Sequence, residues 1–383
     1  MNFSLNDEQM LFKESVENFV AKEFPSDQRR FLNESEEGFS RDHWACFAEL
    51  GWLGLSIAEQ NGGLGGSALD LALLMEGFGR GLAPSPYLAS VVLGGEVVER
   101  AGSSEQKAAI LPALVAGEML LAFAYAEQGG RYDLARIQVR AEKKEQSWLL
   151  YGQKSVVFYA QSADKLIVSA ATAEGISLFL LDSGASGLKL RSYPTIDGLR
   201  AAEVILDGAS AQPLGAPGEA LPVIQSAVDR ATIAVCAEAL GIMNALIEMT
   251  LAYVAERKQF GTAIGKFQVL QHALVDMYMA QELSKSLTYR AAAALAAEDS
   301  GTSALAASAA KVQIGKAGRL IGQQAVQLHG GMGMTDEFAI EVERVDLEDK
   351  IVESMWAGFS KPVMEDPLSG VWISAGTEVD LLQ

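Results

Sequence analysis

The chain has 383 residues, of which 49% are apolar and 21% charged, and its formal net charge is −19. This length predicts two or three folding units, and this composition is typical of a packed globular protein and unlike a disordered one. The acidic balance excludes nucleic acid as a partner, because neutralising phosphates takes clustered Lys and Arg that the sequence lacks.

Cysteine usage and the N-terminus suggest a cytoplasmic protein. Cys46 and Cys236 are far apart and have no CxxC spacing, so neither a disulfide framework nor a thiolate metal site is expected. The N-terminal segment has scattered acids instead of a basic stretch followed by an apolar one. No uninterrupted apolar run reaches roughly 18 residues, so we expect no export signal and no membrane span.

The first third of the chain has helical apolar spacing. Asn6 with Gln9, and later Ser103 with Gln106, have the three-residue offset of a capping box, which marks a helix start. We therefore predict a helical N-terminal domain over residues 1–120.

The middle and last thirds of the chain differ in the spacing of their apolar residues. From Leu121 to Leu214 short β-type runs such as SWLLYG and ISLFLLDS are separated by turn residues, at intervals too short for crossover helices. This predicts a mostly antiparallel β-domain over residues 121–215. Helical periodicity then returns and predicts a bundle over residues 216–383. The order excludes a doubly wound nucleotide-binding fold, in which strands and helices alternate.

Two apparent sites have simpler explanations. The stretch NGGLGGSA, at 61–68, has approximately the spacing of a dinucleotide-binding loop, but neither a clear strand before it nor a βαβ unit after it, so a plain inter-helix loop is favoured. The three histidines, His43, His272 and His329, have no metal-ligand spacing. No metal site is predicted.

Two turns in the helical C-terminal part could bind an anion. In ERKQFGTAIGKFQ, Arg257 and Lys258 end one helix, Gly261 and Gly265 make a compact turn, and Gln268 opens the next helix. Two explanations of this stretch are open. In one, the cations simply cap the C-terminus of the helix, and in the other, Arg257 and the turn bind an anionic group such as a pyrophosphate.

The second turn is AVQLHGGMGMTDE, at 325–337. A helix C-cap explains one glycine well, but the adjacent pair Gly330 and Gly331 would also let backbone N–H groups approach an anion closely.

Several motifs in the same order resemble the flavin-dependent acyl-CoA dehydrogenases over roughly residues 5–340. They include ELGWLGLSIAEQNGGLGG, RKQFGTAIGKFQVLQHALVDM and QLHGGMGMTDE. The resemblance implies an N-terminal helical domain, a central antiparallel β-domain and a C-terminal four-helix bundle. It also implies FAD as cofactor, an acyl-CoA thioester as substrate, an electron-transfer flavoprotein as electron acceptor, and an oligomer.

The family's cofactor contacts carry over position by position. Arg257, Phe260 and Gln268 match residues that reach the flavin of a neighbouring subunit. Gln327, Gly330 and Gly331 match residues near the adenosine and pyrophosphate part of that flavin.

Other family positions are changed. The usual base position after the double glycine holds Ser354, and the alternative base position at the start of the bundle holds Ala231. Ala126 and Phe158 stand where threonines contact the flavin ring, so those side-chain hydroxyls are missing.

This combination resembles the small subunits of two-component acyl-CoA dehydrogenases, such as pimeloyl-CoA dehydrogenase small subunits, which need a second dehydrogenase subunit. Two alternatives remain open. One is a self-sufficient enzyme with a relocated base, for which Glu353 is the first candidate, ahead of Glu343 and Asp346. The other is a pseudoenzyme without flavin.

Overall fold

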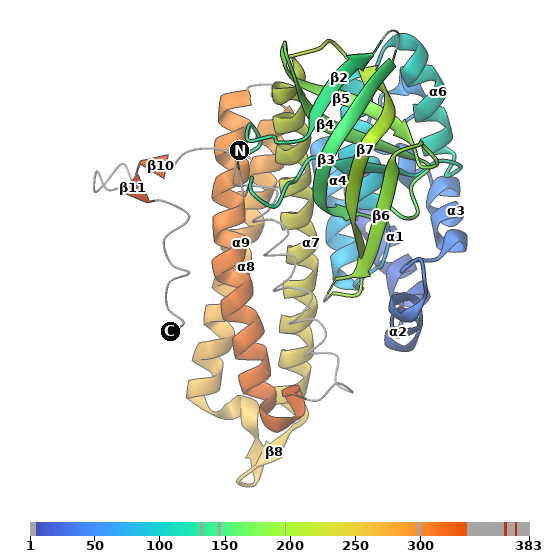
Figure 1. Ribbon diagram of the computed structural model, residues 1–383. Helices are drawn as coiled ribbons and strands as arrows, with labels where there is room; N and C mark the ends of the chain where they lie inside the picture. The colour runs from blue at the N-terminus through green and yellow to red at the C-terminus, as the bar shows by residue number, and fades with distance from the viewer. Residues whose placement is uncertain are drawn as a thin grey trace.

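The computed structural model describes residues 5–130, 133–144, 147–195, 197–296 and 300–334, and the short strands β10 (Met364–Glu365) and β11 (Trp372–Ile373). The candidate bases Glu353, Glu343 and Asp346 lie outside these described residues, as does Ser354. The expected order of helices, sheet and helices is confirmed (Figure 1).

The N-terminal part is helical, and both predicted capping boxes are present. The Asn6 side chain accepts from the Gln9 backbone N–H, and the Ser103 hydroxyl accepts from the Gln106 N–H. The segment NGGLGGSA is the inter-helix loop that the sequence favoured. Its N–H groups at Leu64, Gly65 and Gly66 donate to backbone carbonyls and are not presented to a ligand. The helical elements are α1 (Asp7–Glu23), α2 (Ser26–Glu34), α3 (Arg41–Glu49), the 3₁₀ turns η1 (Trp52–Gly54) and η2 (Glu59–Asn61), α4 (Ala68–Arg80), the π-helix η3 (Leu88–Gly95), α5 (Glu96–Ala101) and α6 (Ser104–Val115).

The middle part forms a sheet of seven strands that is mostly antiparallel, as predicted, although β1 and β2 pair with β4 in parallel. Strand β5 pairs with β7 and also back with β4, so the sheet curls into a closed ring around its own apolar core. The strands are β1 (Leu121–Ala124), β2 (Arg140–Lys144), β3 (Ser147–Phe158), β4 (Lys165–Thr172), β5 (Gly175–Asp182), β6 (Leu188–Pro194) and β7 (Arg200–Leu214).

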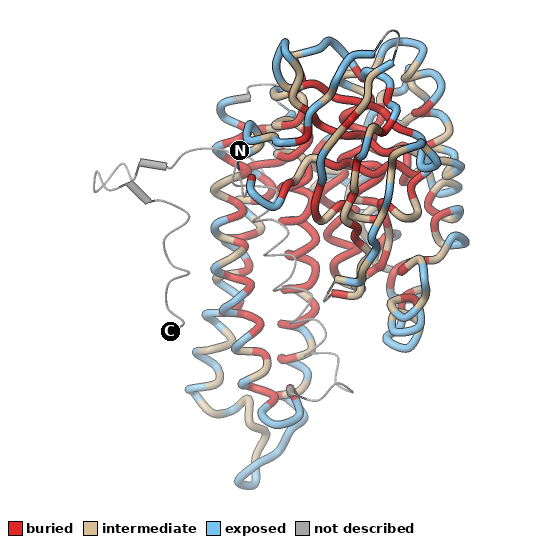
Figure 2. Tube along the Cα trace, in the orientation of Figure 1, coloured by how far each residue is buried: buried red, intermediate tan, exposed pale blue. Residues whose placement is uncertain are grey.

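The C-terminal part consists of long helices. Of the described helices, α7 alone is long and apolar enough to cross a membrane, but 78% of its most apolar window is buried inside the protein, as in a core helix (Figure 2). The fourth helix of the expected bundle would fall after residue 334, among residues not described. The elements are α7 (Ala220–Glu256), the hairpin strands β8 (Lys258–Gln259) and β9 (Thr262–Ala263), the turn η4 (Ile264–Lys266), α8 (Gln268–Ala296), α9 (Ser300–His329) and the turn η5 (Gly330–Met334).

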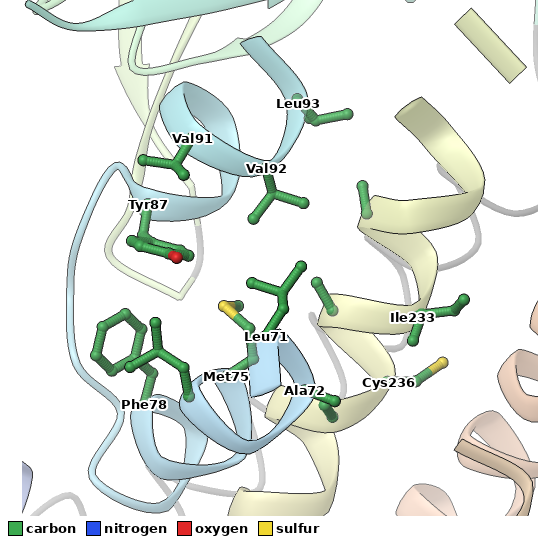
Figure 3. Packing of buried hydrophobic residues seen from close by; sticks show 14 of the residues in the cluster. Leu71, Ala72, Met75, Phe78, Tyr87, Val91, Val92, Leu93, Ile233 and Cys236 are labelled. Carbon is green, nitrogen blue, oxygen red and sulfur yellow. The ribbon is translucent and has the colours of Figure 1, made fainter. Parts of the chain in front are cut away.

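One hydrophobic core joins the N-terminal helices to the bundle, although these parts are far apart in the sequence. Helices α4 and α7 cross in backbone contact: a Cβ at Gly79 would overlap the carbonyl oxygen of Glu238, and one at Gly241 would overlap that of Glu76. Figure 3 shows this region, with Tyr87 just before η3 facing Phe78 and Met75 of α4. The close crossing therefore requires glycine on both helices.

A buried carboxylate also ties the two helical parts together. Glu76 of α4 is 2% exposed and accepts hydrogen bonds from Lys13 Nζ at 2.6 Å, Asn244 Nδ2 at 3.1 Å and Tyr289 Oη at 2.9 Å. Gln281 Nε2 extends the network by donating to Asn244 Oδ1 at 2.7 Å. A buried acid needs such partners, and these come from α1, α7 and α8.

Candidate cofactor and substrate sites

The first predicted anion turn lies at the end of α7. This helix ends at Glu256, two residues before Lys258, where the sequence had suggested its end, and the Arg257 N–H caps it by donating to the Tyr253 carbonyl at 2.8 Å. Phe260 (φ 53°) and Gly261 (φ 78°) form the tip of the β8–β9 hairpin, where two positive φ angles fit a tight hairpin turn. The Phe260 side chain is 93% exposed. The ring at the tip of this hairpin is therefore open to contact from outside the chain.

The second turn lies at the end of α9. Gly330 has φ +62°, so a left-handed helix cap accounts for this glycine. Gly331 has no positive φ, and a Cβ at Gly330 or Gly331 would meet no heavy atom within 4 Å. Neither packing nor backbone conformation therefore requires glycine at 331. What the glycine provides is an open stretch of main chain that a ligand can approach.

His329 joins the two turns. Its ring stacks on Tyr253 of α7 with centroids 4.3 Å apart, and Tyr253 Oη donates to the His329 carbonyl at 3.4 Å. The ring nitrogen Nδ1 lies 2.8 Å from the Ala325 carbonyl. Burial lowers the pKa of His329, so the ring is neutral at physiological pH. The histidine beside the glycines thus holds the ends of α7 and α9 together.

The six carried-over cofactor residues consequently gather at one end of the bundle, and we call them the bundle-end residues. All six are exposed, and the β8–β9 hairpin projects from this end in Figure 1. The bundle-end residues are Arg257, Phe260, Gln268, Gln327, Gly330 and Gly331.

The segments expected beside a flavin ring lie in the β-domain, where a buried ion pair fixes them. Lys154 Nζ of β3 is fully buried and donates to Glu127 Oε1 at 2.7 Å, Ser169 Oγ at 2.9 Å and the Tyr125 carbonyl at 3.3 Å. Burial lowers the pKa of Lys154 to about 8, although the neighbouring Glu127 opposes that shift. The Ser155 N–H donates to the Ala126 carbonyl at 2.9 Å, which completes the contact between the two segments.

A small cavity lies where β3 meets the helices. It has a volume of about 30 Å³, room for roughly one or two water molecules. Its lining includes Phe158 and Tyr159, which follow the ion-paired segment of β3, and Glu238 of α7. The other lining residues are Met75, Phe78, Ala83, Ser85, Tyr87, Leu88, Ala89 and Leu199.

Glu238 is the residue that sequence reasoning missed. It is 8% exposed and follows the alternative base position Ala231 by seven residues, which is two helical turns and therefore the same face of α7. Ala231 is itself buried and has only a methyl group. The available signal was one acid inside the apolar run VCAEALG.

The bundle-end residues and the cavity are well separated. Arg257 follows Glu238 by 19 residues of α7, so at 1.5 Å per residue they lie about 28 Å apart along the helix. The structure therefore brings the six carried-over residues together but keeps them away from Ala126 and Phe158.

The residues of this chain suit the pyrophosphate half of an FAD but not its flavin-ring half. Arg257 suits a pyrophosphate because a guanidinium favours phosphate oxygens, and the main chain at Gly330 and Gly331 is open to close approach. On the ring side, Ala126 and Phe158 offer no side-chain hydroxyl, and Phe158 fills space beside the cavity.

Comparisons with known proteins agree with this architecture. Family models match along the chain for the acyl-CoA dehydrogenase N-terminal domain (residues 6–118), middle domain (122–209) and C-terminal domain (218–356). The probable acyl-CoA dehydrogenase YngJ of Bacillus subtilis is 30% identical over 367 residues, covering 92% of this chain and 95% of that protein.

Solved structures are similar over nearly the whole chain. The ChsE4–ChsE5 complex from Mycobacterium tuberculosis has a TM-score of 0.84 at 25% identity, covering 93% of this chain and 96% of that one. PigA with FAD and proline has a TM-score of 0.86 at 26% identity, covering 94% and 96%. The sequence relative and the three matched domains together decide the assignment: this chain belongs to the acyl-CoA dehydrogenase family of FAD-dependent oxidoreductases.

Proposed function

We propose that this chain is one subunit of a heteromeric acyl-CoA dehydrogenase, and that its partner subunit supplies the catalytic base and the ring-side half of the FAD site. The observation that carries this proposal is the division of the cofactor residues. The bundle-end residues are exposed and suited to a pyrophosphate, and Arg257 lies about 28 Å along α7 from the cavity residue Glu238. The ring-side segment lacks its hydroxyls and borders a cavity of about 30 Å³.

In this arrangement the chain holds the adenosine and pyrophosphate end of an FAD whose ring lies in the partner. Arg257 would neutralise phosphate charge, and the open main chain at Gly330 and Gly331 would let the phosphates approach closely. Phe260, Gln268 and Gln327 are exposed on the same surface and complete the contact.

When bound, FAD would supply the acceptor for the β-hydrogen of an acyl-CoA thioester as hydride, a carboxylate would take the α-proton, and an electron-transfer flavoprotein would be the final acceptor of the two electrons. The described part of this chain places no acid at the alternative base position, which is Ala231. The base is therefore assigned to the partner subunit.

Exposed apolar side chains on the bundle support association with a second subunit. Val275, Met279 and Leu283 follow one another at four-residue intervals on α8 and are each more than half exposed. A further three, Leu305, Val312 and Leu320, are exposed on α9. Apolar surface of this extent on helices is typical of an interface. The similar ChsE4–ChsE5 structure is itself a complex of two different chains.

Co-expression with the acyl-CoA dehydrogenase genes adjacent to its own gene tests the proposal. We expect a co-purifying complex that carries FAD and oxidises an acyl-CoA, and an isolated chain that is inactive. Full activity from the isolated chain would refute the proposal, and Glu238→Gln would then test the described carboxylate on the cavity wall. A complex that shows no flavin absorbance would indicate a pseudoenzyme instead.

A further inference from the structure

The end of β3 leaves the sheet in a strained conformation. The β3–β7 pairing shifts register between Lys154 and Val157, and Val156 has φ 52°. Tyr159 has φ 53°, and its N–H donates to the Arg200 carbonyl at 2.8 Å. β-Branched and aromatic residues rarely adopt positive φ, and such strain persists only where the surroundings enforce it.

This conformation brings Phe158 and Tyr159 to the wall of the cavity, which residues of α4 and α7 also line. The Tyr159 ring is 3% exposed and packs edge-on against Phe39 of the N-terminal part, with centroids 5.7 Å apart. Phe158 packs against the same hydrophobic core. The rings are therefore held from both the β-domain and the N-terminal helices.

The remaining space is too small for an acyl chain. The cavity measures about 30 Å³, whereas a cavity known to bind a molecule as small as benzene measures roughly 150 Å³. Glu238 also lines the cavity, so an acidic residue borders the space that an alkyl chain would have to fill.

The position of the cavity identifies what it would otherwise hold. By the family resemblance, Phe158 stands at a position that contacts the flavin ring, and α7 carries the alternative base position Ala231 on the face that Glu238 shares. A substrate has to lie between ring and base, so this cavity corresponds to the acyl site of a complete subunit. The π-helix η3 begins at the cavity with Leu88 and Ala89, and π-helical turns occur frequently at functional sites.

We infer that Phe158 and Tyr159 are a built-in plug that closes this chain's own acyl site, so that the acyl group binds only in the partner subunit. This inference rests on the proposed function, since the cavity is an acyl site only in a dehydrogenase subunit. The inference goes beyond that function by naming the two residues that close the site. It also predicts that replacing Phe158 with a smaller residue reopens it.

Titration of the isolated wild-type chain with acetyl-CoA and butyryl-CoA tests the plug. Each buried methylene group tightens binding about fourfold, so an open acyl site would prefer butyryl-CoA by more than about tenfold. We expect the two thioesters to bind the wild type equally, or not detectably. A tenfold preference of the wild type for butyryl-CoA would overturn the inference.

Variants at Phe158 test the closure directly. Phe158→Ala should create a preference of about tenfold for butyryl-CoA, and Phe158→Tyr, which keeps a ring, should not. Phe158→Thr serves as a second opening variant, and circular dichroism checks that each variant folds. Folded Ala and Thr variants without any preference would overturn the inference. The titrations measure binding of the thioesters and not turnover, so the subunit role, which co-expression tests, can fail or hold independently.

Discussion

Replacing the buried Lys154–Glu127 pair should change how the stability of the protein depends on pH. Lys154 is fully buried, and burial lowers its pKa from 10.5 to about 8. An unfolded lysine keeps its proton up to about pH 10.5, whereas the folded one loses it above about pH 8. Between these values the unfolded state binds more protons, so the free energy of unfolding rises with pH.

The magnitude follows from the size of that shift. A shift from 10.5 to about 8 costs the folded state about 3 kcal/mol at pH 8, and about 2 kcal/mol of this is regained by pH 10. Glu127 tolerates a neutral Lys154 because its carboxylate also accepts from the backbone N–H groups of Gln138 and Val139, at 2.7 and 3.2 Å.

The assay compares urea unfolding of the wild type with that of a double variant, Lys154→Met with Glu127→Gln, at pH 8, 9 and 10. The double variant retains every other titrating group, including Lys311, whose pKa is also lowered to about 8. The wild type should gain about 2 kcal/mol relative to this variant as the pH rises. A stability difference that stays constant, or that moves in the opposite direction, would refute the reasoning.

Three further substitutions test the packing and the interface. Gly79→Ala should destabilise the protein by about 3 kcal/mol or more in urea melts, because the new Cβ would overlap the Glu238 carbonyl. Helix propensity alone predicts the opposite, a gain in stability of about 1 kcal/mol, so the sign of the measured change distinguishes the two effects. Tyr289→Phe removes one hydrogen bond to the Glu76 carboxylate and should cost about 2 kcal/mol in the same assay. Met279→Asp places a charge on the exposed face of α8 and should weaken subunit association at least tenfold in analytical ultracentrifugation, without changing the thermal stability of the isolated chain.

Matched controls separate these effects from general sensitivity. Gly184→Ala adds a methyl group where no heavy atom lies within 4 Å. Tyr278→Phe removes a hydroxyl from a side chain that is 57% exposed. Both should change the free energy of unfolding by less than about 0.5 kcal/mol. A loss in either control as large as in its partner variant would contradict the packing argument.

The sequence predicted the architecture because local signals and periodicity agreed with each other. The capping boxes at Asn6 and Ser103 start helices as expected, and Gln268 begins α8. The bundle-end residues could be named because short motifs carry them, and the structure adds that one histidine, His329, joins the two turns. Whether these residues bind FAD remains the prediction that the experiments address.

The cavity could not be predicted, because it depends on tertiary geometry. A register shift and a positive φ at Tyr159 decide where the Phe158 ring lies, and neither is visible in the letters KSVVFYA. Glu76 and Glu238 did leave a signal, since each is a lone acid in an apolar helical run. Only the structure shows that Glu76 belongs to a hydrogen-bond network, whereas Glu238 lines the cavity.

The central claim is that this chain holds part of an FAD whose ring lies in a partner. The most direct measurement is the FAD content of the co-expressed complex when this chain carries Arg257→Ala, with Arg191→Ala on the exposed surface of β6 as control. Loss of a charge-assisted contact to phosphate should weaken FAD binding about tenfold to a hundredfold, and the control should not. Unchanged FAD content in the Arg257 variant, together with a full complement of FAD on the isolated wild-type chain, would contradict the account.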